Sequence, residues 1–156
     1  MLRAGLLGTV LLFAAASFTA AQPVWPHYSV EQEHFEVLSM RAAMPLNPSA
    51  VYDVTCIDSN LKIVFHDQNV AQLSICGGIA GSVNKCRGGP SDTVGHSGSA
   101  KFTLTPANPD STINISKDRW EQCIRAARAI CPTGSMAGVC SGGTTSGDLK
   151  FSLDHS

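Results

Sequence analysis

The residues best suited to catalysis are two histidines, His66 and His96. Asp67 follows His66 directly, and a histidine beside a carboxylate can exchange protons with a substrate near neutral pH. His96 lies in a glycine-rich stretch. We prefer the simpler interpretation, that both histidines are exposed polar side chains. General acid–base chemistry at these two positions is the alternative.

Other catalytic and cofactor motifs are absent from the sequence. It contains no G-x-S-x-G, no H-E-x-x-H and no phosphate-binding Walker loop. The stretch Gly77-Gly78-Ile79-Ala80-Gly81 lacks the glycine order of a dinucleotide-binding loop. We therefore expect no catalytic residue and no cofactor.

The cysteines are the most informative residue type. Their number is even, no C-x-x-C pair occurs, and no two histidines have a metal-ligand spacing, so three disulfides are expected and a metal site is not. The six are Cys56, Cys76, Cys86, Cys123, Cys131 and Cys140.

Six cysteines allow many pairings, and the sequence leaves them open. Cys123 and Cys131 stand two turns apart on a predicted helix, about 12 Å by helix rise, so they cannot bond each other. Our working hypothesis pairs Cys76 with Cys86 and Cys131 with Cys140, closing short loops. Cys56–Cys123 would then tie a strand to the helix.

The N-terminus resembles a secretory signal peptide over residues 1–21. Arg3 precedes an apolar run over residues 4–18, and Thr19-Ala20-Ala21 supplies small residues before a cut at Gln22. A membrane anchor is the alternative, but the run is short and has no basic stop-transfer flank. We expect a secreted, extracellular protein with a flexible lead-in at 22–33 and a single domain at 34–156.

Strand-like alternation recurs along the chain. It predicts strands at 35–40, 51–57, 61–65, 100–105 and 149–153, and a strand or a short helix at 70–76. The second of these strands would place Tyr52, Val54 and Cys56 on one face. Tyr52 is expected in the core, and the glycine-rich stretches at 77–99 and 132–147 are expected to be long loops.

The clearest element is a helix at 116–131. Trp120, Cys123, Ile124 and Ala127 form an apolar stripe at helical spacing, with Trp120 expected in the core, and Ser116 can cap the first turn. A helix between strands predicts a small disulfide-stabilised α+β fold, a two-layer sandwich with the helix on one face of a mostly antiparallel sheet.

Charge excludes one class of partner and leaves another open. The net charge is −1, and 15% of residues are charged without basic blocks, so we expect no nucleic-acid binding. The predicted helix carries Lys117, Arg119, Arg125 and Arg128. We interpret these as a solvated face, with an anionic partner as the alternative.

Two short motifs point to processing. Asn114-Ile115-Ser116 is a sequon that could carry an N-linked glycan. Leu38-Ser39-Met40-Arg41 fits a kexin-like cleavage site, which would make residues 22–41 a pro-segment. Burial of the same residues as a strand is the interpretation that we slightly prefer.

The chain resembles small secreted cysteine-containing proteins of filamentous fungi, a class that includes candidate effectors. From Lys101-Phe102-Thr103-Leu104, through the predicted helix, to Gly147-Asp148-Leu149-Lys150-Phe151, its layout is similar to killer-toxin-like fungal proteins. Residues 34–41 resemble the opening strand of fungal cell-wall-associated proteins.

These observations predict a secreted, non-enzymatic, effector-like or toxin-like binding protein that acts on a host or competitor target. We expect a monomer that binds a protein, a membrane or a cell-wall polysaccharide through the glycine-rich loops. The alternatives are a small hydrolase or ribonuclease-like enzyme using His66 or His96, and a structural cell-wall protein.

Overall fold

The computed structural model describes residues 45–78, 86 and 88–156. The predicted signal peptide, the lead-in at 22–33, the strand at 35–40 and the motif ending at Arg41 lie outside the described residues. In the described part, no helix is both long and apolar enough to cross a membrane.

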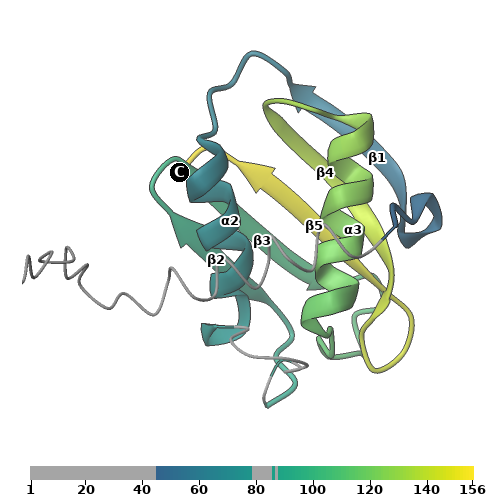
Figure 1. Ribbon diagram of the computed structural model, residues 1–156. Coiled ribbons are helices and arrows are strands. Elements are labelled where there is room, and N and C mark those ends of the chain that lie inside the picture. The colour runs from purple at the N-terminus through teal and green to yellow at the C-terminus, as the bar shows by residue number, and fades with distance from the viewer. Residues whose placement is uncertain (1–44, 79–85, 87) are drawn as a thin grey trace, which may run out of the picture.

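The described residues contain a five-stranded sheet in which every neighbouring pair is antiparallel (Figure 1). The strand order is β1-β4-β5-β3-β2. The central hairpin therefore comes from the end of the chain, and β1 and β2 form the two edges. The strands are β1 (Val51–Asp58), β2 (Thr93–Ser97), β3 (Ala100–Pro106), β4 (Ser135–Gly143) and β5 (Asp148–Asp154).

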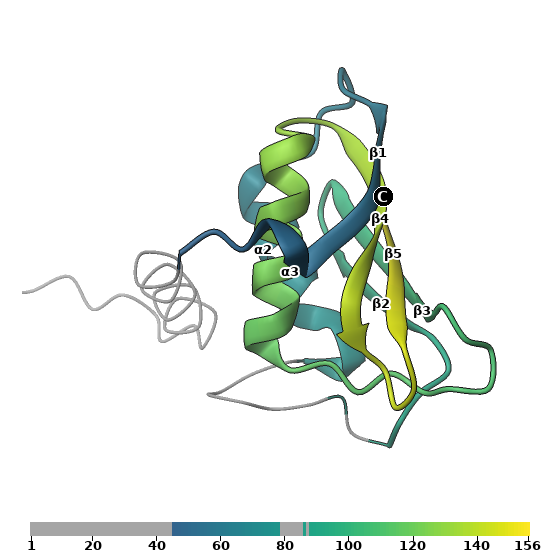
Figure 2. The same ribbon diagram turned by 90° about the vertical axis from the view of Figure 1, so that its right-hand side faces the viewer.

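Two helices lie on the same side of this sheet (Figure 2). α2 (Phe65–Ser74) contacts β2 and β3, whereas α3 (Lys117–Ile130) contacts β1 and β4. Two short 3-10 turns, η1 (Pro48–Ala50) and η2 (Ile75–Gly77), precede β1 and follow α2. The fold is thus α+β, and the side of the sheet away from the helices is called the open sheet face below.

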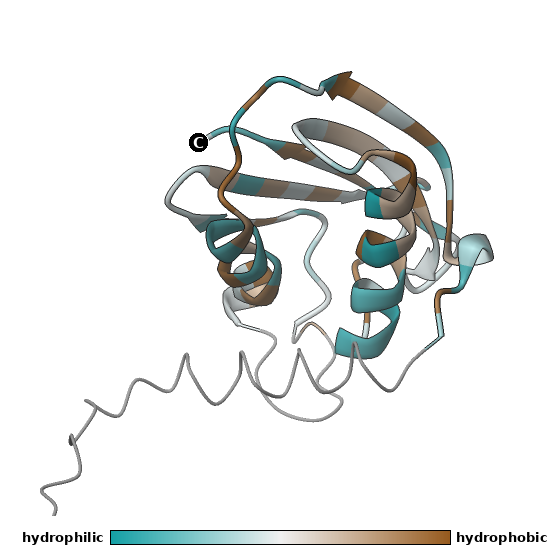
Figure 3. Cartoon of the chain, turned by 45° about the horizontal axis from the view of Figure 1, so that its top comes forward, coloured by the Kyte–Doolittle hydropathy of each residue, from teal (hydrophilic) through white to brown (hydrophobic). Residues whose placement is uncertain are grey.

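The core follows the alternation predicted for β3 and β5. Phe102, Leu104, Leu149, Phe151 and Leu153 are buried, and polar residues alternate with them along the strands (Figure 3). Trp120 is 1% exposed, as expected for a core residue. Its ring lies edge-on to Phe102 and Phe151, with centroids 5.3 Å and 5.8 Å away, so α3 packs directly onto the central strands.

The predicted helix is confirmed. α3 begins after Ser116, whose side-chain oxygen accepts a hydrogen bond from the Arg119 amide at 3.4 Å. Asp118 lies in the first turn and Arg128 in the last, where each complements the helix dipole.

The predicted loop at 132–147 is wrong, because most of it is strand β4. Two of its glycines, Gly134 and Gly138, are packing positions. A β-carbon on Gly138 would lie 3.0 Å from the Phe151 ring, and one on Gly134 would lie 1.8 Å from the Asp58 carbonyl oxygen. The absence of a side chain lets neighbouring groups approach the backbone, and a pattern of turn residues cannot distinguish this use of glycine from a loop.

The predicted loop at 77–99 is also partly wrong. Residues 79–85 and 87 lie outside the described residues, but Thr93–Ser97 form β2 and pair with β3. Gly95 is not a loop residue either. A β-carbon there would lie 2.0 Å from the Ala71 carbonyl oxygen, so this glycine allows α2 to contact the strand.

The strand predicted at 51–57 is confirmed as β1, but its facing is wrong at Tyr52. Asp53 has a φ of 51°, and the register with β4 shifts between Tyr52 and Thr55. The bulge reverses the alternation, so Cys56 faces the helices whereas Tyr52, 41% exposed, lies on the open sheet face. There its hydroxyl donates a hydrogen bond to Asp148 Oδ2 at 2.6 Å.

The strand predicted at 61–65 is wrong as well. Residues 61 and 63 are half-buried and 62 and 64 exposed, so the alternation is real, but this extended segment pairs with no strand. Phe65 instead begins α2, which settles the choice at 70–76 in favour of a helix that ends at Ser74. The buried face of α2 is formed by Gln68, Asn69, Ala71 and Gln72, so it gives no apolar periodicity to detect.

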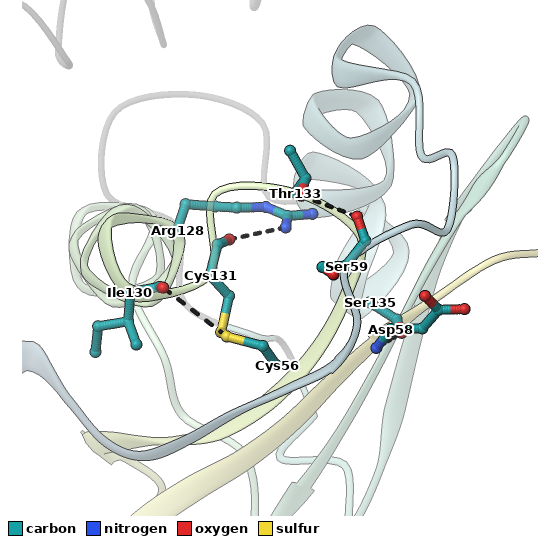
Figure 4. The surroundings of a disulfide bond; sticks show 8 residues. All are labelled: Cys56, Asp58, Ser59, Arg128, Ile130, Cys131, Thr133 and Ser135. Atoms are coloured by element: carbon teal, nitrogen blue, oxygen red, sulfur yellow. Dashed lines mark hydrogen bonds between the residues drawn. A yellow bond between two sulfur atoms is a disulfide. The ribbon is translucent and has the colours of Figure 1, made fainter.

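All six cysteines form disulfides, and one of the three expected pairs is confirmed. Cys76–Cys86 closes a local loop as expected. The pairs Cys131–Cys140 and Cys56–Cys123 are wrong. Cys123 bonds Cys140. Cys131 bonds Cys56 (Figure 4). β4 begins at Ser135, near the C-terminal end of α3, and runs back along the helix. Five residues of strand advance about 17 Å, which brings Cys140 level with Cys123. Cys131, just beyond the helix, is left beside β1.

Candidate functional site

The structure does not bring His66 and His96 together. His66 lies in the first turn of α2, on the helix side of the sheet. On β2, Thr93 and Gly95 are buried beneath α2, so the alternating His96 faces the opposite side, where its ring contacts the Ser156 hydroxyl. The two histidines therefore lie on opposite sides of the sheet, and the geometry gives no support to a shared acid–base site.

Asp67 has a structural role. Its Oδ2 accepts hydrogen bonds from the Ser99 amide and the Ser99 hydroxyl, both at 2.8 Å, and so holds the β2–β3 turn against α2. These bonds, the backbone one foremost, keep the pKa of the Asp67 carboxyl below its usual value. A carboxylate engaged in this way is poorly placed to accept a proton from a substrate.

A hollow region lies between the start of α2 and the end of α3, and is called the interhelical groove. It consists of two adjoining hollows of about 380 Å³ and 510 Å³ that share Phe65, Gln68 and Arg128. The first hollow also includes Leu46, Ile124 and Arg125, and the second extends along residues 59–64 and 132–134.

Large apolar side chains are unusually accessible around this groove. Phe65 is 61% exposed, Val64 54% and Leu46 48%. Among the described residues that line the two hollows, three are basic (Lys62, Arg125 and Arg128) and none is acidic. An exposed apolar surface with one sign of charge is typical of an interaction site.

Three hydrogen bonds hold the side chain of Arg128 at the groove. Its Nε and Nη2 atoms donate to Gln68 Oε1 at 2.9 Å and 2.7 Å, and Nη1 donates to the Cys131 carbonyl at 3.0 Å (Figure 4). Partial burial lowers the pKa of this guanidinium, yet arginine stays charged at neutral pH. Three of its five N–H groups are used, so the guanidinium is fixed in place while it can still donate to a ligand.

A buried polar contact holds the two walls of the groove together. Gln72 on α2 donates from Nε2 to Glu121 Oε2 on α3 at 2.6 Å, and both residues are nearly inaccessible. Trp120 Nε1 donates to the Gln72 carbonyl oxygen at 2.9 Å. These bonds cross between helices, so they fix the width of the groove before any ligand arrives.

The four basic residues predicted on the helix surface have different roles in the structure. Lys117 is only 3% exposed, and Arg119 donates to the Ser141 carbonyl oxygen at 2.6 Å, which ties α3 to β4. Only Arg125 and Arg128 line the groove. The interpretation of these residues as a solvated face is therefore wrong for Lys117, and two of the four cations line the groove.

The open sheet face carries a second, shallower hollow of about 350 Å³. Hydroxyl groups of Thr103, Thr105 and Ser152 line it, together with Asp53 and Lys150. Ala137, Gly138, Val139 and Phe151 complete its lining.

Asn114 is half-buried, and its backbone amide donates to the Gly143 carbonyl at 2.8 Å. Glycosylation at Asn114 stays a prediction. Among the described residues, no cluster of three or more metal-ligating side chains occurs.

Sequence reasoning missed the interhelical groove because its walls are distant in the chain. Gln68 and Arg128, which meet across it, are 60 positions apart. The only signal in the sequence was the pair of arginines on the predicted helix. Comparison with known proteins found no matching family model, no similar curated protein and no matching solved structure.

Proposed function

We propose that this chain is a secreted, non-enzymatic binding protein that acts outside the producing cell, holding an acidic, apolar peptide segment of a target protein in its interhelical groove. The observation that carries this proposal is the lining of the groove, where exposed Phe65 lies beside Arg125 and Arg128 and no lining residue is acidic. Apolar side chains supply most of the binding energy in such grooves, and fixed charges select the partner.

Secretion is supported by two independent features. The N-terminal sequence resembles a signal peptide, and the three disulfides fit an oxidising compartment. An effector-like or toxin-like role in a filamentous fungus rests on the resemblance of the C-terminal third to killer-toxin-like proteins.

A selection from a library of displayed peptides tests the proposed function. The bait is the folded chain beginning at Gln22, with a specific endoprotease site inserted after Arg41, and it is used both intact and cut. We expect the cut chain to enrich peptides that combine Asp or Glu with apolar residues. The double variant Phe65→Ser/Arg125→Glu should lose this enrichment, because it removes an apolar anchor and reverses one charge.

The matched control is Val94→Ser, which changes a 46% exposed residue on β2, at the opposite side of the sheet from the groove. It should enrich the same peptides as the parent chain. Enrichment of no peptides by the cut chain, or of the same peptides by the groove variant, contradicts the proposed function.

A second candidate function rests on the open sheet face. Its hollow presents hydroxyl groups from Thr103, Thr105 and Ser152 beside Lys150, and such groups can form hydrogen bonds with a cell-wall polysaccharide. Co-sedimentation with insoluble chitin and glucan tests this candidate. Retention that is lost in Thr105→Val/Lys150→Ala supports a wall-binding role, whereas a chain that stays in solution contradicts it.

A further inference from the structure

We propose that the interhelical groove is first occupied by the protein's own residues 31–44, so that the chain blocks its own binding site until it is cut after Arg41. That docking keeps a target out of the groove rests on the proposed function, but the docking itself can be tested separately. The described chain starts at Pro45, and the next residue, Leu46, already lines the groove. The described chain therefore begins at the groove.

The composition of this segment complements the groove. Glu31, Glu33 and Glu36 are its acidic residues, and within the segment no lysine or arginine precedes Arg41, although His34 lies between Glu33 and Glu36. The lining of the groove has the opposite bias, with Lys62, Arg125 and Arg128 and no acid. Glutamates that meet arginines at a partly desolvated surface form stronger ion pairs than they would in water.

The apolar residues of the segment match the exposed apolar side chains of the groove. Phe35 lies between Glu33 and Glu36, and Val37, Leu38 and Met40 follow Glu36. Docking would cover part of the surface that Phe65, Val64 and Leu46 expose, and the removal of apolar side chains from water favours docking.

The chain is long enough to make this contact. An extended segment advances about 3.3 Å per residue, so residues 36–44 can reach roughly 30 Å from Pro45. The C-terminal end of the segment is tethered next to the site, which raises the effective concentration to about the millimolar range and favours docking over capture of a free peptide.

The cleavage motif gives this contact a regulatory consequence. A secretory endoprotease that cuts after Arg41 adds water across the Arg41–Ala42 peptide bond, leaving a carboxylate on Arg41 and an amine on Ala42. The three glutamates and Phe35 are then no longer covalently attached to the domain that carries the groove. The local concentration of the segment falls, and the groove becomes available to a target.

Photo-crosslinking in the intact chain tests the docking. Phe65 is replaced by benzoylphenylalanine, a substitution that its 61% exposure makes tolerable, and the chain beginning at Gln22 is irradiated. We expect an adduct at the monomer mass whose peptide map joins position 65 to residues 31–44. The same probe at Leu46, which is 48% exposed, should give the same adduct.

Two controls make the result specific. The probe at Val94, on the other side of the sheet, should give no adduct with this segment. The triple variant Glu31→Gln/Glu33→Gln/Glu36→Gln should lower the docking equilibrium about tenfold, and the adduct yield with it, because three ion pairs are lost.

The outcomes separate the two proposals. Adducts only at the dimer mass would identify a second copy of the chain as the occupant, and the absence of any adduct with residues 31–44 would also overturn self-docking. If self-docking fails while the cut chain enriches acidic, apolar peptides, the proposed function stands alone. If the adduct forms but no peptide is enriched, the groove serves only its own segment.

Discussion

Gly95 of β2 lies directly against Ala71 of α2, so closely that a β-carbon on Gly95 would be 2.0 Å from the Ala71 carbonyl oxygen. The same β-carbon would lie 2.8 Å from Ile75 Cγ2. The helix thus packs on the bare backbone of an edge strand. This contact positions α2, and with it Phe65 and Gln68, which form one wall of the interhelical groove.

We therefore predict that Gly95→Ala destabilises the fold by about 2–3 kcal/mol or more, because the helix must move away from the sheet. Urea unfolding followed by circular dichroism measures the loss. Val94→Thr, at the exposed neighbouring position, should stay within about 0.5 kcal/mol of the parent. Equal stability of Gly95→Ala and the parent would show that α2 does not rest on β2.

The three disulfides should differ in their contribution to stability. Cys56–Cys131 closes a separation of 75 residues, Cys123–Cys140 one of 17 and Cys76–Cys86 one of 10. Loop-closure entropy predicts losses of about 4.5, 3 and 2.7 kcal/mol when each pair is replaced by alanine.

Urea midpoints of the three double alanine variants measure this ranking. The intact mass of the parent should rise by about 6 Da on full reduction, two hydrogens for each disulfide. The ranking is contradicted if removal of Cys76–Cys86 costs as much as removal of Cys56–Cys131.

Stability should decline in acid partly through Asp67. Ser99 donates two hydrogen bonds to this carboxylate and lowers its pKa in the folded state. A group with a lowered folded pKa stabilises the protein above its unfolded pKa, about 3.9, and this contribution disappears as the pH falls through the folded pKa.

The variant Asp67→Asn should therefore be less stable than the parent at pH 7, and its free energy of unfolding should change less between about pH 5 and pH 2. Urea midpoints across this range make the comparison. Ser99→Ala removes one donor and should show part of the same flattening. Parallel pH profiles for the parent and Asp67→Asn would refute the assignment.

Arg128 should contribute to stability as well as to binding. Arg128→Ala removes three hydrogen bonds and leaves the side-chain oxygen of Gln68, a residue only 4% exposed, without its donor. We expect a loss of about 2–3 kcal/mol. Lys62→Ala, at an exposed position on the same groove, should change stability by less than about 0.5 kcal/mol. Thermal unfolding of the two variants decides whether Arg128 is a structural cation or only a surface charge.

The sequence alone determined the elements that local patterns encode. β3, β5 and α3 were predicted correctly because each combines a regular apolar period with clear boundaries, such as the Ser116 cap. The even number of cysteines and their spacing also predicted that all six form disulfides. These signals act within one or two turns of chain, so no knowledge of the rest of the fold is needed to interpret them.

The tertiary structure decided every feature that depends on contacts between distant parts of the chain. Whether Gly95 and Gly138 belong to loops or to packed strands depends on Ala71 and Phe151, residues far away in the sequence. The cysteine pairing depends on β4 running back along α3. The groove exists only because α2, whose buried face is polar, packs beside α3 and brings Gln68 to Arg128. Such contacts depend on the three-dimensional path of the backbone, which a local residue pattern does not encode.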